Sequence, residues 1–428
     1  MNIQTASSEG TTVPDSSFRH CVLLIIDGLG DLPVAELGDM TPLEAASTPV
    51  LDRLAAEGLY GLVDPIVPGE IPNTHSGTGM LMGMLPQQAD RLHRGPVEAS
   101  GAGRVLSPGE IALRVNFASI ERGADGLLVT DRRAGRISEG TRELAAVLND
   151  IELGDGVRAS LWPTDQHRAA LVLSGPGLDA HISNTDPGDS RMPAAVLQCK
   201  ALRPEAEFTA NKVNLFVELA YQRLKRHPLN IARKKADKHC ATGIITRGAG
   251  AHFTLDNLLH RFGLTAAVVS GCNTVLGLGR IFGFTALSDS RFSATVDTDL
   301  DAKIATVITA LDDYPMVFLH IKAPDLCSHD RQPLAKRDFL QRLDAALEPL
   351  LNSGVIIALA ADHTTDSNTG FHTADPVPAL IWQSPVAATG ETVSFGESAC
   401  RTGTMQRQFS NAFLLRLLKM MGCKVEAV

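Results

Sequence analysis

Residues 21–26 read CVLLII, a continuous apolar run that ends at Asp27. Such a run is typical of a strand that is buried on both faces of a parallel sheet, because helices cover both sides of such sheets. Two later runs, at residues 316–321 and 355–361, have the same character and also precede an aspartate. Ligands of open α/β proteins bind where the carboxyl ends of the strands meet. The sequence therefore predicts carboxylates gathered at one edge of a parallel sheet.

Helical patterns separate these runs, for example at Thr48-Pro49, where Thr is a favoured N-cap and Pro a favoured first helical residue. Strands that alternate with helices predict a doubly wound α/β core. Between about residues 86 and 240 the pattern changes to short alternating segments rich in Gly, Pro and Arg, which predicts an inserted, smaller α+β domain. We therefore expect a disordered N-terminal tail (1–18), a first core part (19–85), the insert (86–240) and a second core part (241–428).

Composition excludes several classes of protein. The 428 residues carry a net charge of -9, and Lys and Arg are concentrated only locally, as at residues 225–238, which argues against a nucleic-acid partner. The longest apolar runs are far shorter than the roughly 20 residues that cross a bilayer, and residues 1–17 lack the features of a signal peptide. The 7 cysteines are scattered and never form a C-x-x-C pair. We expect a soluble, cytoplasmic protein with reduced thiols and no membrane partner.

Metal-ligand residue types follow the last two runs. Asp325 and His329 have the i,i+4 spacing that places two side chains on one side of a helix, and Asp362-His363 follow the third run directly. His372 lies in a Gly-Phe-His turn nearby in sequence. Each feature has an ordinary alternative, such as a solvated ion pair or a hydrogen-bonded loop histidine. Together they favour a metal centre, because buried carboxylates and imidazoles need a positively charged partner.

The order of these residues resembles the alkaline phosphatase superfamily, and in particular its archaeal-type cofactor-independent phosphoglycerate mutases. The resemblance extends over nearly everything from residue 21 onward. It is carried by Asp27-Gly-Leu-Gly30, Thr41-Pro-Leu-Glu-Ala-Ala46, Asn73-Thr74, Arg94-Gly-Pro-Val-Glu-Ala-Ser-Gly-Ala-Gly103, Asn116-Phe-Ala118, Asp131-Arg-Arg-Ala-Gly-Arg136, Arg247-Gly-Ala-Gly250, Asp325-x-x-x-His329, Asp362-His363, His372 and Asp375-Pro-Val-Pro378. It implies an alkaline phosphatase-like core sheet with an inserted domain.

The resemblance also implies two divalent ions, Mn²⁺ or Zn²⁺ with Mg²⁺ as an alternative. The implied ligands are Asp325, His329 and His372 for one ion, and Asp27, Asp362 and His363 for the other, with Thr74 between them as nucleophile and shared ligand. Metal coordination would favour the alkoxide of a hydroxyl that is otherwise a weak nucleophile. Thr74 can also be read as a helix N-cap, and Ser76 is the rival nucleophile.

Arginines in the predicted insert are the candidate substrate ligands. A planar guanidinium grips carboxylate and phosphate in a bidentate manner, whereas arginines of no functional role are simply solvated. The candidates for a small phosphorylated carboxylate substrate are Asn116, Asp131, Arg132, Arg133, Arg136, Arg247 and Lys322.

Three positions differ from the mutase pattern. Thr74 stands where Ser is usual, Leu276 where a phosphate-binding Lys is typical, and Gly188 where His is common; Arg280 is a candidate to replace the missing cation. The leading hypothesis is a mutase that interconverts 3- and 2-phosphoglycerate through phospho-Thr74. The alternative is a metal-dependent phosphatase, phosphodiesterase or phosphonate hydrolase, and the third reading is a metal-binding protein without activity. A homo-oligomer stays an open alternative.

Overall fold

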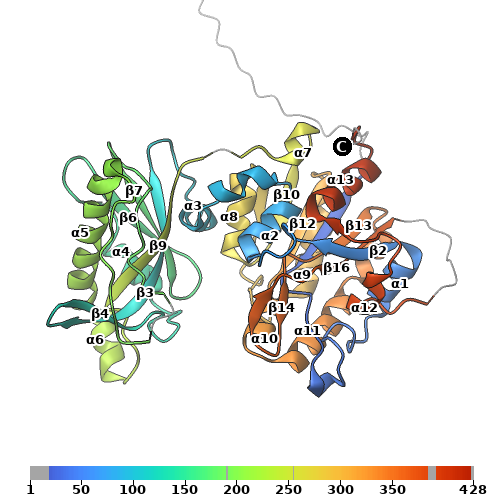
Figure 1. Cartoon of the computed structure of the whole chain (residues 1–428), viewed down its shortest axis with the longest axis horizontal. Coiled ribbons are helices and arrows are strands. Elements are labelled where there is room, and N and C mark those ends of the chain that lie inside the picture. The colour runs from blue at the N-terminus through green and yellow to red at the C-terminus, as the bar shows by residue number, and fades with distance from the viewer. Residues whose placement is uncertain (1–18, 189–190, 254, 384–391, 426–428) are drawn as a thin grey trace, which may run out of the picture.

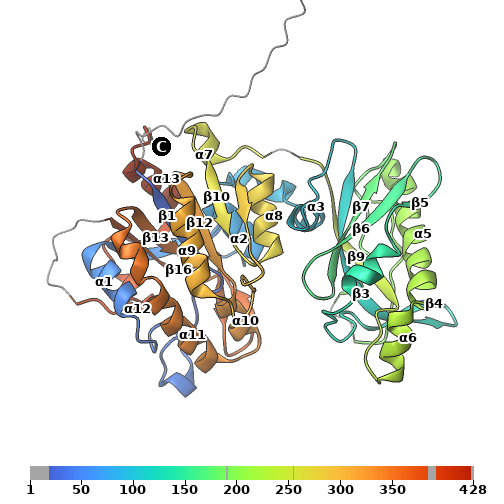
Figure 2. The same cartoon turned by 180° about the vertical axis from the view of Figure 1, so that it is seen from behind.

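The computed structural model describes residues 19–188, 191–253, 255–383 and 392–425, without the side chains of residues 89–91. The tail expected at residues 1–18 lies outside these ranges. Figures 1 and 2 show two bodies side by side, one made of the blue, yellow and red parts of the chain and the other of the green part. The smaller, green body is the insert.

The core is built on an 8-stranded sheet with the order β11-β10-β12-β1-β13-β16-β2-β17. Its strands are β1 (Cys21–Ile26), β2 (Leu59–Asp64), β10 (Ala266–Val269), β11 (Thr285–Leu287), β12 (Met316–Ile321), β13 (Ile356–Ala360), β16 (Val377–Gln383) and β17 (Gln408–Phe409). β1 lies between β12 and β13 and runs parallel to both, and every residue of β1 is fully buried. The three strands predicted from the apolar runs are therefore confirmed as neighbours.

Helices cover the sheet, as the two opposite views show (Figures 1 and 2). They are α1 (Pro49–Glu57), α2 (Thr74–Leu81), α7 (Leu258–Arg261), α8 (Asn273–Ile281), α9 (Leu300–Ala310), α10 (Ala323–His329), α11 (Pro333–Ala346), α12 (Glu397–Arg401) and α13 (Ser410–Met421), with 3-10 turns at Ala35–Leu37, Pro86–Arg91 and Glu348–Asn352. A short hairpin of β14 (Thr364–Asp366) and β15 (Phe371–Thr373) follows β13. The doubly wound α/β core is confirmed.

The insert holds a 7-stranded sheet with the order β5-β6-β7-β3-β4-β8, and β9 pairs with β3. Its elements are β3 (Ile111–Gly123), β4 (Gly126–Asp131), α4 (Thr141–Ala146), β5 (Ile151–Glu152), β6 (Arg158–Pro163), β7 (Arg168–Ser174), β8 (Ala194–Ala195), a 3-10 turn at Pro204–Ala206, α5 (Glu207–Leu224), α6 (Pro228–Lys235) and β9 (Gly243–Ala251). All strand pairings are antiparallel, and α5 and α6 lie on the side away from the core in both views. The expected α+β insert is confirmed.

Two hydrophobic clusters underlie the two bodies. The cluster of the insert runs from Ile111 to Ile244, and β9 continues its sheet to Ala251. The segment expected to begin the second core part at residue 241 thus lies in the sheet of the insert. We propose limits for the insert near residues 110 and 251.

The helix α3 (Arg94–Gly101) joins the two bodies, since it packs against α8 of the core and β3 of the insert. The contact with α8 is close: a Cβ added to Gly277 would lie 2.2 Å from the Val97 carbonyl oxygen. Glycine is therefore required at this crossing, because no side chain fits between the helices.

Two further expectations concern the state of the cysteine thiols and the presence of membrane-spanning helices. All 7 cysteines are free thiols, as expected for a chain without a disulfide framework. Within the described ranges, no helix combines the length and the apolar character that a membrane crossing requires.

Candidate active site

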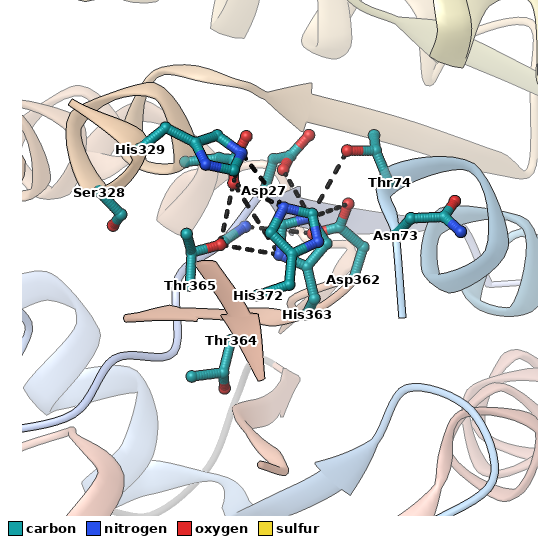
Figure 3. A network of polar contacts seen from close by, with 12 residues as sticks. Asp27, Asn73, Thr74, Ser328, His329, Asp362, His363, Thr364, Thr365 and His372 are labelled. Carbon is teal, nitrogen blue, oxygen red and sulfur yellow. Dashed lines mark hydrogen bonds and ion pairs between the residues drawn. The ribbon is translucent and has the colours of Figure 1, made fainter. Parts of the chain in front are cut away.

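The carboxyl ends of the three central strands deliver the predicted ligands to one place (Figure 3). Asp27 follows β1, Asp362 follows β13, and Asp325 lies in the first turn of α10 after β12. The donor atoms form two groups, each within 4.8 Å: Asp325 with His329 and His372, and Asp27 with Asp362 and His363. The structure thus brings together the same two groups that the resemblance implied.

The hydrogen bonds of His329 and His372 determine which ring nitrogen is free. The Nδ1–H of His329 donates to the Gly370 carbonyl (2.7 Å), and that of His372 donates to the Pro72 carbonyl (3.0 Å). In the neutral rings both Nε2 atoms then carry lone pairs, yet they lie 3.2 Å apart and each is 3.4 Å from Asp325 Oδ1. Two nitrogen lone pairs and a carboxylate oxygen that face one another in this way are suited to bind a cation. In metal-binding histidines the other ring nitrogen typically donates to a carbonyl oxygen, as both rings do here.

The same reasoning applies to His363. The Thr365 hydroxyl donates to Asp325 Oδ1 (2.9 Å) and so accepts the Nδ1–H of His363 (2.9 Å). The Nε2 lone pair of His363 then faces Asp27 Oδ1 (3.2 Å) and Asp362 Oδ2 (3.4 Å). Asp27 Oδ1 is buried and accepts no hydrogen bond from any described residue. The second group therefore also fits a cation.

Electrostatics lead to the same conclusion. Burial opposes ionisation of Asp27 and Asp325, but the Lys322 ammonium and the hydrogen bonds from neighbouring histidines together outweigh it and keep the pKa of both carboxyls below the usual range. Burial, reinforced by the charge of Asp27, raises the pKa of Asp362 well above its ordinary value. One ammonium cannot balance three buried carboxylates, and divalent cations would supply the missing charge. Mixed oxygen and nitrogen donors suit Mn²⁺ or Zn²⁺.

Lys322 lies at the centre of this cluster. Its Nζ donates to Asp27 Oδ2 (2.9 Å), Asp325 Oδ2 (2.6 Å) and the Thr74 hydroxyl (3.1 Å). His320, in β12, also contacts Asp27 Oδ2 through Nε2 (3.1 Å). Sequence reasoning missed His320, although a histidine inside an apolar strand was a signal for it. It also missed Thr365, because nothing in the sequence around this threonine distinguishes it from an ordinary strand residue.

Thr74 is the first residue of α2, and its Oγ1 lies 3.5 Å from His363 Nε2. The N-cap of α2 is Asn73, which forms a capping box with Ser76, so the reading of Thr74 as the cap is wrong. The hydroxyl of Ser76 donates to the Asn73 carbonyl (3.1 Å) and is thereby engaged in the cap. A Cβ on Gly77 would lie 1.9 Å from the Asp362 carbonyl oxygen, so glycine lets the helix approach the candidate metal ligands closely.

Apart from Lys322, which lies in the core, the candidate substrate residues lie in the insert. Arg132 forms a bidentate pair with Asp186 (both contacts 2.8 Å), and Arg247 lies 3.8 Å from the same carboxylate. Asn116 donates to the Arg132 carbonyl (3.2 Å), and Asp131 accepts from the Arg133 backbone (2.7 Å). Arg247 is in the middle of β9.

Arg136 differs from this group. Its side chain is 61% exposed, and its guanidinium is 4.0 Å from Asp330 of the core. It therefore contacts the core at the surface.

Three further arginines, which sequence reasoning did not assign, extend the cluster: Arg94, Arg114 and Arg168. Burial, and then the charges of Arg94 and Arg114, lower the pKa of His75 to about 3. His75 follows Thr74, so the arginines of the insert are electrostatically close to the start of α2. The buried Nε of Arg247 has no acceptor among the described residues. Such an excess of buried donors and positive charge fits an anionic ligand.

The structure bears on two of the positions that differ from the mutase pattern, Leu276 and Gly188. Leu276 is buried in α8, and the guanidinium of Arg280 donates to the carbonyls of Ser100 (2.8 Å) and Gly101 (3.0 Å). Arg280 thus holds the end of α3, which argues against its role as a replacement phosphate ligand. Gly188 has a φ of 73°, where a histidine would be strained. The cation nearest to Thr74 Oγ1 in these contacts is Lys322.

Comparisons with known proteins agree on one family. A family model described as 2,3-bisphosphoglycerate-independent phosphoglycerate mutase matches residues 55–230. The mutase of that name from Methanopyrus kandleri is 37% identical over 415 residues, which is 95% of this chain and 97% of that protein. The one from Ignicoccus hospitalis is 39% identical over 392 residues, 90% of this chain and 93% of that protein.

Solved structures agree. The cofactor-independent phosphoglycerate mutase of Thermoplasma acidophilum has a TM-score of 0.67 and 28% identity, covering 94% of this chain and 100% of that one. A Pyrococcus horikoshii protein has a TM-score of 0.78 and 27% identity, covering 96% of this chain and 99% of that one. The chain therefore belongs to the 2,3-bisphosphoglycerate-independent phosphoglycerate mutase family.

Proposed function

We propose that this protein interconverts 3-phosphoglycerate and 2-phosphoglycerate, with Thr74 carrying the phosphoryl group between the two hydroxyls of glycerate and two divalent ions bound by the six ligands. The observation that carries the proposal is the position of Thr74 Oγ1, which lies 3.5 Å from His363 Nε2 and 3.1 Å from Lys322 Nζ, the ammonium that also contacts Asp27 and Asp325. Bound divalent ions would offset the negative charge of the phosphate and favour an ionised nucleophile.

The residues of the chain have complementary roles in this reaction. Thr74 Oγ attacks the phosphorus, and the glycerate oxygen that leaves takes up a proton. After glycerate reorients, its other hydroxyl loses a proton, attacks the same phosphorus and releases Thr74. The free backbone N–H groups at the start of α2 stabilise the phosphoryl oxygens, as helix N-termini do, and the Lys322 ammonium stabilises them from the other side.

The insert would hold glycerate while it is separated from its phosphoryl group. Arg247 has an unpaired buried Nε, and Arg132 is held in a fixed orientation by Asp186. Both suit a carboxylate, which guanidinium groups bind in a bidentate manner. A mutase must also keep water from the phosphoenzyme, and enclosure of the substrate between insert and core would do so.

A hydrolase is the alternative, favoured by the loss of the typical Lys at Leu276. In that case water accepts the phosphoryl group from Thr74. Lys322 argues for the mutase, since it places a cation beside the nucleophile without a contribution from α8.

A product assay separates the two activities. With 3-phosphoglycerate as substrate, we expect 2-phosphoglycerate, read out by coupling to enolase, and little inorganic phosphate, which is measured in parallel. Arg247→Ala should lower kcat/KM by about 10²-fold, because it removes a buried donor from the carboxylate site. Arg416→Ala, an exposed arginine of α13, is the matched control and should have no effect. Inorganic phosphate without 2-phosphoglycerate would establish the hydrolase instead.

Metal analysis tests the other half of the proposal. We expect two divalent ions per chain after gentle purification, and loss of both ions and activity on chelation, with recovery on addition of Mn²⁺ or Zn²⁺. Asp325→Asn should lower the content to about one ion, because it removes a ligand charge from one group only. Asp330→Asn, a nearby exposed aspartate, should leave the metal content unchanged. Full activity in protein shown by elemental analysis to hold no metal would contradict the two-ion proposal.

A further inference from the structure

The insert contains a second, basic cavity that the proposed reaction does not use. Its volume is about 890 Å³. Fifteen residues line it, among them Ser119, Arg122, Lys234, Lys235, Lys238 and Cys240. These residues come from β3, β4, the end of α5 with Lys225 after it, α6 and the segment before β9, and none of them is a candidate substrate residue. Both views place α5 and α6 on the side of the insert away from the core (Figures 1 and 2).

The charges around this cavity are strongly unbalanced. Five of its residues are Lys or Arg, and Glu121 is the single acidic one. Arg122 is paired with Glu218 outside the cavity. Lys234, Lys235 and Lys238 form no ion pair within the described ranges. Unpaired cations around a concave surface concentrate anions there.

The wall of the cavity contains a polar atom that lacks a partner. Ser119 is 8% exposed, and its hydroxyl is buried without a hydrogen bond to any described residue. A buried hydroxyl is almost always paired, because leaving it unpaired costs free energy. Ser119 also lies at an irregularity in the pairing of β3 with β4, between Ser119 and Ile120, and such bulges commonly direct a side chain toward a ligand. The Ser119 hydroxyl is therefore free to donate to a partner that is not part of the chain.

We propose that this cavity binds a small phosphate ester, with the lysines of α6 and Lys238 around its phosphate and the Ser119 hydroxyl donating to it. Phosphate offers several acceptor oxygens and at least one negative charge, which matches unpaired ammonium groups and an unpaired hydroxyl donor. The volume accommodates a ligand the size of a nucleotide or a sugar phosphate. The site does not depend on the reaction proposed for Thr74.

Calorimetric titration of the full-length, metal-loaded protein tests the proposal directly. The probes are AMP, fructose 1,6-bisphosphate and inorganic phosphate. We expect at least one of the two esters to bind with a Kd below about 100 µM. The triple variant Lys234→Ala, Lys235→Ala, Lys238→Ala should weaken that binding by tenfold or more, whereas Lys200→Ala, an exposed lysine elsewhere on the insert, should not change it.

Ser119→Ala tests the proposed hydrogen bond from the Ser119 hydroxyl to the phosphate. It removes a hydroxyl that has no partner in the chain, so the ligand-free protein should keep its melting temperature or gain slightly. It should nevertheless weaken the ester by about tenfold, since a hydrogen bond to a charged group is lost. Arg247→Ala separates this site from the arginine cluster, and ester binding should survive it.

The alkylation rate of Cys240 can show whether the cavity is occupied, independently of any enzyme assay. Cys240 is the partly exposed cysteine of the chain, the other six being buried, and it lines the cavity. A saturating ester should slow its alkylation severalfold, as measured by mass spectrometry of the Cys240 peptide. The proposal is wrong if neither ester binds, if only inorganic phosphate binds, if binding is lost in Arg247→Ala, or if a bound ester leaves Cys240 alkylation unchanged. Binding of a single-stranded oligonucleotide with neither ester would show a nucleic-acid surface instead.

Discussion

Thr74→Ala is expected to lower kcat by about 10⁴-fold or more while the fold and the metal content stay nearly intact. The change removes the only hydroxyl that lies against both Lys322 Nζ and His363 Nε2 in the described site. The structural cost is small, because Asn73, and not Thr74, caps α2. Steady-state kinetics, thermal unfolding and elemental analysis of the same preparation measure the three quantities separately.

Two neighbouring variants are the controls for this prediction. Thr74→Ser keeps a hydroxyl at the same position and should retain partial activity. Ser76→Ala breaks the capping box and should cost about 1 kcal/mol of stability with activity retained. A dead Ser76→Ala beside an active Thr74→Ala would show that the nucleophile is Ser76.

The sequence predicts the position of a side chain well when that side chain directly follows a recognisable strand. Strands that are buried on both faces have a continuous apolar pattern that is easily recognised in a sequence. The residues that directly follow three neighbouring parallel strands lie at the same edge of the sheet. The sequence alone therefore predicts that Asp27, Asp325 and Asp362 lie together. The pairing of each ion with its ligands came from the family resemblance, since spacing alone could not distribute six donors between two groups.

Contacts between distant segments were not predictable in this way. His75 belongs to the core and Arg114 to the insert, and the helix α3, which packs against both bodies, lies between them in the sequence. Arg280 was expected near phosphate because of its place in a motif, yet its geometry directs it to the end of α3. Long side chains reach several partners, so sequence alone does not decide which one they contact.

A buried ion pair beneath the metal site illustrates the same limit. Lys336 of α11 and Asp31 are fully buried, and Nζ lies 2.7 Å from Asp31 Oδ2 and 3.0 Å from the Ser328 hydroxyl. Asp31 also accepts from the backbone N–H (2.8 Å) and hydroxyl (2.6 Å) of Ser367. The pair thus joins the loop after Asp27, the helix that carries His329, and the segment that leads to His372.

Lys336→Met should therefore destabilise the core by about 3–5 kcal/mol, because it leaves the Asp31 carboxylate buried without its cation. Urea unfolding can be followed in the core alone: of the two tryptophans, Trp382 lies in β16 and Trp162 in the insert, so Trp162→Phe as background makes the signal specific. Adding Asp31→Asn to Lys336→Met removes the unpaired buried charge and should recover part of the lost stability, which a packing defect alone would not show.

Arg53→Ala, which breaks the exposed i,i+4 pair with Glu57, is the control and should cost less than about 0.5 kcal/mol. A loss below about 1 kcal/mol in Lys336→Met, or no recovery in the double variant, would mean that the pair does not hold the metal-binding segments together.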